Sequence, residues 1–178
     1  ATAEVRRRRL QAEKQLNLAL RTTAAKRSAD TAPDVRIPGF TPAGGFLLAI
    51  IHVERTCSDS PNPLEHIRTG LDHAAAALLP GAGYCLCDNH REHNQLLLCL
   101  QAPAGHRSRS EFTPLLRQLI TESAQGLGVR LHTGLSCIRD HIDQELYRQA
   151  RTALDLRYLE PHKCVHRYST SIDNLPAQ

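Results

Sequence analysis

The sequence has no methionine and no tryptophan, and aromatic residues make up only 4% of its 178 residues. No apolar run approaches the roughly 20 residues that a membrane-spanning helix needs. The longest run, 46–53, is interrupted by His52. The N-terminus is polar and rich in arginine, so it does not resemble a signal peptide. We therefore expect no membrane contact by this chain, and the missing initiator Met predicts a fragment of a longer protein.

The cysteines lack the CxxC spacing that is typical of structural zinc sites. Most of the six lie in strand-like apolar runs, where a free cysteine behaves as a small buried hydrophobe. Cys85 and Cys87 should point to one face of a strand, because side chains alternate along it. A disulfide or a soft-metal site, with His90 and His93 nearby, is the less favoured alternative. Reduced cysteines favour a cytoplasmic setting, and we expect no metal and no cofactor.

Charge is distributed unevenly along the chain. Residues 1–30 carry eight Lys or Arg against three Asp or Glu, whereas the remainder carries 14 against 15. A nearly neutral body argues against a nucleic-acid surface on it. The run Arg6–Arg9 could contact DNA or acidic lipid, but a solvated helix face or a partner contact is the favoured interpretation.

The N-terminal segment predicts a helix over residues 1–28, because it contains neither proline nor glycine. Its apolar residues are few and loosely spaced: Val5, Leu10, Leu16 and Leu20. So thin a stripe suits a connecting or coiled-coil-like helix better than a core helix. The proline- and glycine-rich residues 33–45 then predict the boundary of the compact domain.

Hydrophobic patterning predicts an alternating order of strands and helices in the body. A buried strand over 46–53 precedes a helix that Asn62 caps, and two strands follow, joined by the polar turn 89–94. Further elements are a helix after Ser110, a strand over 129–137, a helix over 142–154 and a strand over 163–168. The order β-α-β-β-α-β plus α-β predicts an α+β, ferredoxin-like two-layer sandwich with an added α-β unit and helices on one face.

Residues 46–170 resemble the palm domain of diguanylate cyclases, the GGDEF family. Three segments carry the resemblance: Leu131–Ser136, Glu145–Leu154 and Lys163–Tyr168. They are similar to a family strand, to its helix of the pattern eeL...A..AL, and to its closing strand. A degenerate form of that domain in bacterial response regulators that end in an AraC-type helix-turn-helix is more similar still.

This resemblance implies a division of the chain. Residues 1–32 would be a basic helical linker, 33–45 a connector, 46–170 the GGDEF-like regulatory domain, and 171–178 the start of a linker to a DNA-binding domain. An upstream receiver or sensor domain and a downstream helix-turn-helix would be partners within the full-length protein. In the full-length protein, DNA would be contacted only through the downstream helix-turn-helix domain.

Cyclase chemistry needs two carboxylates that hold divalent metal ions. The corresponding strand here reads His52-Val53-Glu54, and histidine is a poor ligand for Mg²⁺, which prefers oxygen. The turn 89–94 has no glycine and no neighbouring pair of acids. We therefore expect a domain that is not an enzyme.

Three hypotheses about function follow. The first is a non-catalytic module for signal transmission and dimerisation, a homodimer paired with the help of residues 1–28. The second is a receptor that binds a small molecule or nucleotide in a degenerate cleft around His52, Glu54 and Glu92. The third is a surviving cyclase in which Glu54 and Glu92 hold metal. His66 and His73 share a helix face and are interpreted as surface residues.

Overall fold

The computed structural model describes residues 2–23, 37, 40, 45–55, 63–78, 83–102, 112–124 and 129–171. The elements, in chain order, are α1 (Ala3–Ala19), β1 (Gly45–Arg55), α3 (Pro63–Leu78), β2 (Gly83–Asp88), β3 (Gln95–Ala102), α4 (Phe112–Ala124), β4 (Val129–Leu135), α5 (Gln144–Asp155), the 3₁₀ turn η2 (Leu156–Tyr158) and β5 (Val165–Arg167). Most of the predicted connector 33–45 and linker 171–178 lies outside these residues, as do the Asn62 cap and Ser110. None of the helices in the described ranges is long and apolar enough to cross a membrane.

The predicted order of elements is confirmed, and the protein is a mixed α+β domain. One five-stranded sheet has the order β2-β3-β1-β4-β5. Neighbouring strands are antiparallel except for β4 and β5, which are parallel. The strand β3 therefore lies between β1 and β2, which are joined through α3.

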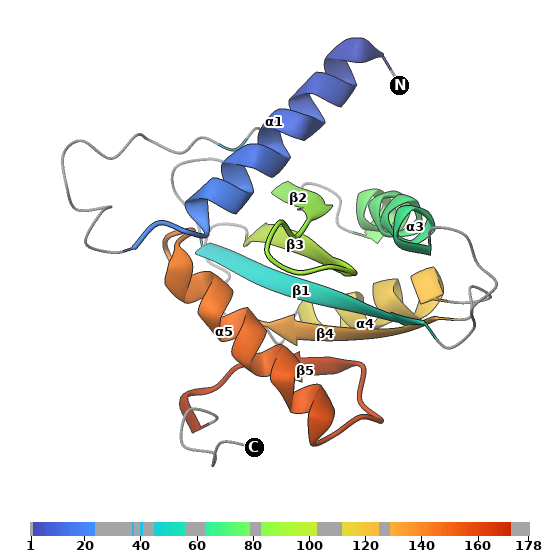
Figure 1. Cartoon of the computed structure of the whole chain (residues 1–178), viewed down its shortest axis with the longest axis vertical. Helices are drawn as coiled ribbons and strands as arrows, with labels where there is room; N and C mark the ends of the chain where they lie inside the picture. The colour runs from blue at the N-terminus through green and yellow to red at the C-terminus, as the bar shows by residue number, and fades with distance from the viewer. Residues whose placement is uncertain are drawn as a thin grey trace.

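The sheet is covered on both faces, so the predicted two-layer arrangement is wrong (Figure 1). Alternate residues of β1, such as Leu47 and Ile51, pack against α3 and α4. The intervening residues, such as Leu48 and Ile50, pack against α5 and the end of α1. All eight residues of β3 are buried. Continuous apolar strands of this kind are typical of sheets that are buried on both faces.

The helices α3 and α5 each connect two parallel strands, β1 to β2 and β4 to β5. The two connections run in opposite directions across the sheet, and their starting strands are antiparallel. If the β1–α3–β2 and β4–α5–β5 connections had the same handedness, α3 and α5 would lie on the same face of the sheet. Because α3 and α5 lie on opposite faces, the two connections have opposite hands, although right-handed connections are the rule.

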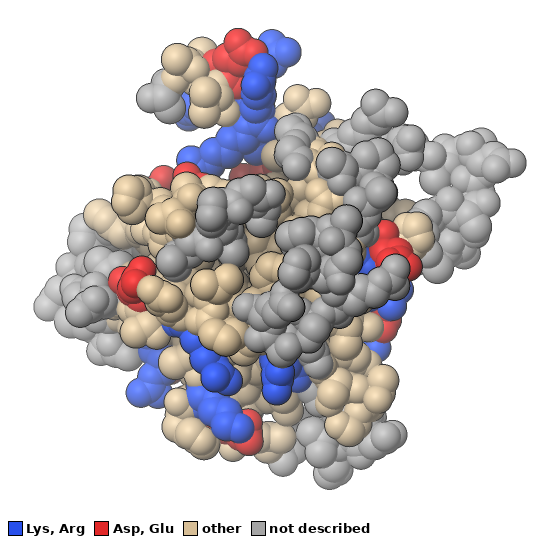
Figure 2. All heavy atoms as spheres, turned by 180° about the vertical axis from the view of Figure 1, so that it is seen from behind, with Lys and Arg blue, Asp and Glu red and all other residues tan. Residues whose placement is uncertain are grey.

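The first helix is shorter than predicted and has two different halves. It ends at Ala19, where the N–H groups of Arg21 and Thr22 turn to carbonyls three residues back. Val5 and Leu10 are 56% and 58% exposed, on the end that projects from the body (Figure 2). Residues of the last turns, including Leu16, are buried in the core. The packed body therefore includes the C-terminal half of α1.

Candidate functional site

An open hollow of about 330 Å³ lies beyond the C-terminal end of α5. Its floor is the face of the sheet that α5 covers further along. The lining residues are His52, Glu54, Arg130, His132, Arg157, Tyr158 and Pro161. The first four lie on β1 and β4, and the rest follow α5.

Strand register brings the four residues of the floor together. His52 is paired with His132 across the two antiparallel strands, and Glu54 with Arg130. Because directly paired residues point to the same face of a sheet, all four side chains rise on one side. The helix stops at Asp155, so this end of the face is not covered by helix.

His132 is the most buried polar side chain of the hollow. It is 3% exposed, and its Nε2 lies 3.1 Å from Oε2 of Glu54. An imidazole N–H that donates to the carboxylate accounts for this contact. The other ring nitrogen, Nδ1, is buried without a hydrogen-bond partner in the protein. A buried polar atom of this kind is a natural contact point for water or a ligand.

His52 lies beside it and is only partly buried. Its Nδ1 is 3.4 Å from Nε2 of Gln95. Burial lowers the pKa of His52, and the neighbouring Arg157 and His132 lower this pKa further. The carboxylates of Glu54 and Glu92 act in the opposite direction on the same pKa. The neutral imidazole is therefore favoured over the charged form.

Glu92 does not line the hollow. It is an exposed residue of the turn between β2 and β3, and only its charge reaches His52. The structure thus brings together two of the three predicted site residues, His52 and Glu54, and leaves the third apart. His66 and His73 are exposed on α3, as predicted.

Sequence reasoning missed Arg130, His132, Arg157 and Tyr158. The alternation Arg130-x-His132 on a predicted strand did place two polar groups on one face. The pairing of that strand with β1 supplies the remaining information, and neither composition nor spacing fixes this register.

The lining carries a net positive charge. Two guanidinium groups face one carboxylate, beside the two imidazoles. The guanidinium of Arg157 is positioned by donation to Oη of Tyr158 at 2.7 Å and by its place over that ring. Such a lining attracts anions and disfavours a divalent cation.

Within the described ranges, no group of three or more His, Cys, Asp or Glu is arranged to hold a metal ion. This includes the predicted alternative of Cys85, Cys87, His90 and His93. The two thiols lie in the core beneath α1, whereas His90 contacts Glu13 on the surface at 2.9 Å. On the neighbouring β5, Nε2 of His166 is a further buried ring nitrogen without a partner.

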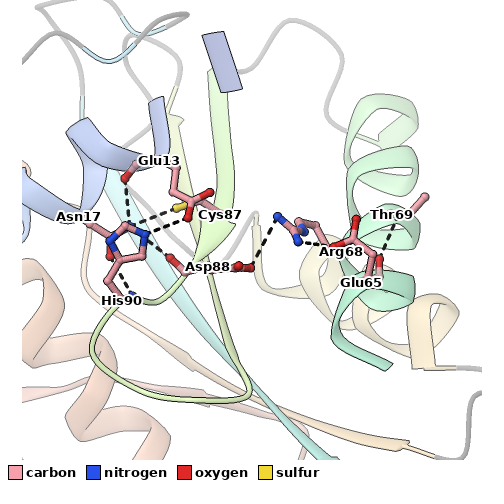
Figure 3. A network of polar contacts seen from close by, with 8 residues as sticks. All are labelled: Glu13, Asn17, Glu65, Arg68, Thr69, Cys87, Asp88 and His90. Atoms are coloured by element: carbon pink, nitrogen blue, oxygen red, sulfur yellow. Dashed lines mark hydrogen bonds and ion pairs between the residues drawn. The ribbon is translucent and has the colours of Figure 1, made fainter. Parts of the chain in front are cut away.

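A polar network joins α1 to the turn between β2 and β3 (Figure 3). The amide of Asn17 donates to the carbonyl of Asp88 at 3.2 Å and accepts from the backbone N–H of His90 at 3.1 Å. On the other side of β2, Arg68 of α3 forms ion pairs with Asp88 at 3.7 Å and with Glu65.

Neither the known protein families nor the curated protein sequences give a match to this chain.

Proposed function

We propose that the chain is a non-catalytic regulatory domain that transmits a signal between its N-terminal helix and its body. The arrangement of α1 carries this proposal. Its projecting half bears Arg6–Arg9, while its C-terminal half is part of the core and is bonded to the turn between β2 and β3. A change in what the projecting half contacts would therefore act directly on the sheet.

The order of elements supports a ferredoxin-like core related to the cyclase palm. The first six elements of the sheet region follow β-α-β-β-α-β, with β3 between β1 and β2. An additional α5-β5 unit follows. On this view the domain belongs to a bacterial transcription regulator of the response-regulator type, in the cytoplasm, with an AraC-like DNA-binding domain downstream.

Three features argue against catalysis at the hollow. A cyclase needs two carboxylates at the end of β1, and His52 occupies one of those places. The remaining Glu54 is engaged by His132. Glu92 is too far around the turn to line the same hollow. We expect no cyclic dinucleotide when the protein is incubated with GTP and Mn²⁺, and formation of that product contradicts the proposal.

The flanking coding sequence tests the regulatory assignment. We expect a helix-turn-helix domain after Gln178 and a receiver or sensor domain before residue 1. In that full-length regulator, Asn17→Ala should change the response of a promoter reporter to the signal, whereas Glu4→Gln on the exposed half should not. A stop codon after Gln178, or two variants that both respond as the parent does, contradicts it.

A second candidate function is that of a receptor for a small anion, and the cationic hollow favours it. The guanidinium groups of Arg130 and Arg157 would donate hydrogen bonds to a phosphate or carboxylate in the hollow. Calorimetry with inorganic phosphate, GTP and cyclic dinucleotides, with and without Mg²⁺, tests it. Arg157→Gln should abolish the heat of binding, and Arg151→Gln, on the exposed face of α5, should retain it. Absence of heat from the parent at high ligand concentration contradicts this candidate.

A further inference from the structure

The hydrogen bonds at the β2–β3 turn form a directed chain that ends on His52. The side-chain oxygen of Asn89 accepts from the N–H of Arg91 at 3.0 Å. Its Nδ2 then donates to Oε1 of Gln95 at 3.0 Å and to the phenol oxygen of Tyr147 at 3.0 Å. Because Oε1 of Gln95 is used in this way, its Nε2 faces Nδ1 of His52.

This order of donors and acceptors selects one state of His52. An amide Nε2 can only donate, so Nδ1 of the imidazole must accept and can carry no proton. We propose that protonation of His52 is coupled, through the amides of Gln95 and Asn89, to the β2–β3 turn and thereby to the docking of α1.

The coupling follows from what a proton on Nδ1 would require. Two donors would then face each other, so Gln95 would have to turn its amide to offer Oε1 to His52. That rotation places its Nε2 against Nδ2 of Asn89, again two donors. If Asn89 rotates in response, the N–H of Arg91 loses its acceptor. Because Asn89 and Gln95 are buried, none of these mismatches is relieved cheaply by water.

The turn between β2 and β3 contacts the end of α1 directly. The guanidinium of Arg91 donates to the carbonyl of Leu20 at 3.1 Å and lies 4.2 Å from the ring centre of Tyr147. The preceding residue, His90, donates its backbone N–H to Oδ1 of Asn17. A disturbed turn therefore loses contacts to the last turns of α1.

The charged and titratable groups around His52 come from four elements. Glu54 lies on β1, His132 and Arg130 on β4, Arg157 on η2, and Glu92 on the turn. The two acids favour a proton on His52, and Arg157 and His132 oppose it. An anion in the hollow would offset the basic groups and favour protonation. The inference rests on the proposed function for its regulatory meaning, since it would connect the hollow to the helix that carries the signal.

Hydrogen exchange between pH 5 and pH 8 tests the coupling, in the whole chain carrying His90→Gln. That background removes the ion pair between His90 of the turn and Glu13 of α1, which is a second contact between these two elements. Protection factors of the α1 amides near Asn17 and of the Arg91 amide should fall on acidification, with the midpoint of the His52 titration seen by NMR. If the pKa of His52 differs by about one between the docked and undocked states of α1, the equilibrium constant for docking changes roughly tenfold.

Two variants decide the origin of that change. His52→Gln cannot take up the proton, and Gln95→Leu interrupts the chain of amides, so both should remove the pH dependence. His73→Gln and Gln118→Leu, at exposed positions on α3 and α4, are the matched controls and should retain it. If Gln95→Leu does not fold, His52→Gln alone decides.

The coupling is overturned if α1 protection is independent of pH while His52 titrates. It is also overturned if the dependence persists in His52→Gln. Both results would leave the proposed function standing, because that function is tested by the flanking domains and the reporter rather than by exchange.

Discussion

At the scale of single residues, Gly134 of β4 has the least free space among the glycines in the described ranges, because α5 crosses the strand there. A Cβ added to Gly134 would lie 2.2 Å from the carbonyl oxygen of Ala150 and 2.4 Å from the backbone nitrogen of Leu154. Both neighbours are helix backbone, which cannot move without displacing α5. We predict that Gly134→Ala lowers the free energy of unfolding by roughly 3 kcal/mol, at the upper end of overpacking costs, as measured by urea denaturation.

Gly70 provides the matched control for that substitution. It lies inside α3, and the nearest atom to an added Cβ is the Ser123 side chain at 3.9 Å, an ordinary contact distance. Alanine is the better helix former, so Gly70→Ala should raise the free energy of unfolding by roughly 0.5–1 kcal/mol. Equal effects of the two substitutions would mean that α5 does not lie on Gly134 as described.

Two histidines, the partly buried His52 and the buried His166, make stability depend on pH. Burial is the largest cause that lowers the pKa of His52 and of His166 below 6.5. The folded protein then binds fewer protons than the unfolded chain, so both groups contribute stability above pH 6.5 that is lost as pH falls through their folded values. We predict that the free energy of unfolding declines from pH 7 to pH 5.

The double variant His52→Gln and His166→Gln should show a smaller decline over the same range, measured by urea denaturation at each pH. Exposed His73→Gln serves as the control and should follow the parent. A parent whose stability is unchanged between pH 7 and pH 5 contradicts the prediction.

At the scale of elements, the projecting and docked halves of α1 should respond differently to substitution. Asn17 is buried and exchanges hydrogen bonds with the backbone at Asp88 and His90. Asn17→Ala removes the hydrogen-bond partner of the Asp88 carbonyl and of the His90 backbone N–H, and should lower the free energy of unfolding by about 1–3 kcal/mol. Glu4→Gln breaks only the exposed pair with Arg8 and should change stability by less than about 0.5 kcal/mol. If Asn17→Ala is as mild as Glu4→Gln, the network of Figure 3 does not hold the helix.

The order of elements was predictable because local signals mark each one. The polar turn 89–94 separates two apolar runs, and Asp143 caps α5 by accepting from the N–H of Leu146. The face that α5 covers was not predictable in the same way. The usual right-handed connection would place α5 beside α3 and α4. Only the apolar character of both faces of β1 and β3 indicated that a second layer of helices was needed.

The site was predictable only as far as its residues lie on one strand. His52 and Glu54 alternate on β1, so their common face follows from the sequence. The contributions of Arg130 and Arg157 depend on strand pairing and on where the chain turns after α5, which are long-range properties. The same holds for α1, whose thin stripe suggested a connecting helix although Leu16 and Leu20 are in the core.

At the scale of the whole molecule, the dimer predicted from residues 1–28 now depends on the projecting half of α1. Of the predicted apolar stripe, Leu16 and Leu20 are used within the chain, which leaves Val5 and Leu10 for a partner. We predict a weak dimer in sedimentation that strengthens with added salt, because salt screens the repulsion between two Arg6–Arg9 runs.

The combined substitution Val5→Glu and Leu10→Glu should abolish that dimer. Point substitutions are preferable to removal of residues 1–32, because such a deletion would also strip core residues from the sheet. Leu159→Glu, at another exposed leucine after η2, is the control and should dimerise as the parent does. A parent that stays monomeric at all concentrations, or variants that dimerise equally, would exclude α1 as the dimer element.

Cys85, Cys87 and Cys99 are buried in the cluster that includes the end of α1, so their thiols are internal probes of how often this helix opens. A thiol reagent should label the exposed Cys164 at the rate of a free thiol. It can reach the three buried sulfurs only during the intervals in which α1 or the β2–β3 turn has moved aside. The ratio of the slow labelling rate to the fast one, followed by mass spectrometry in native buffer, would then give the fraction of time that the body spends open.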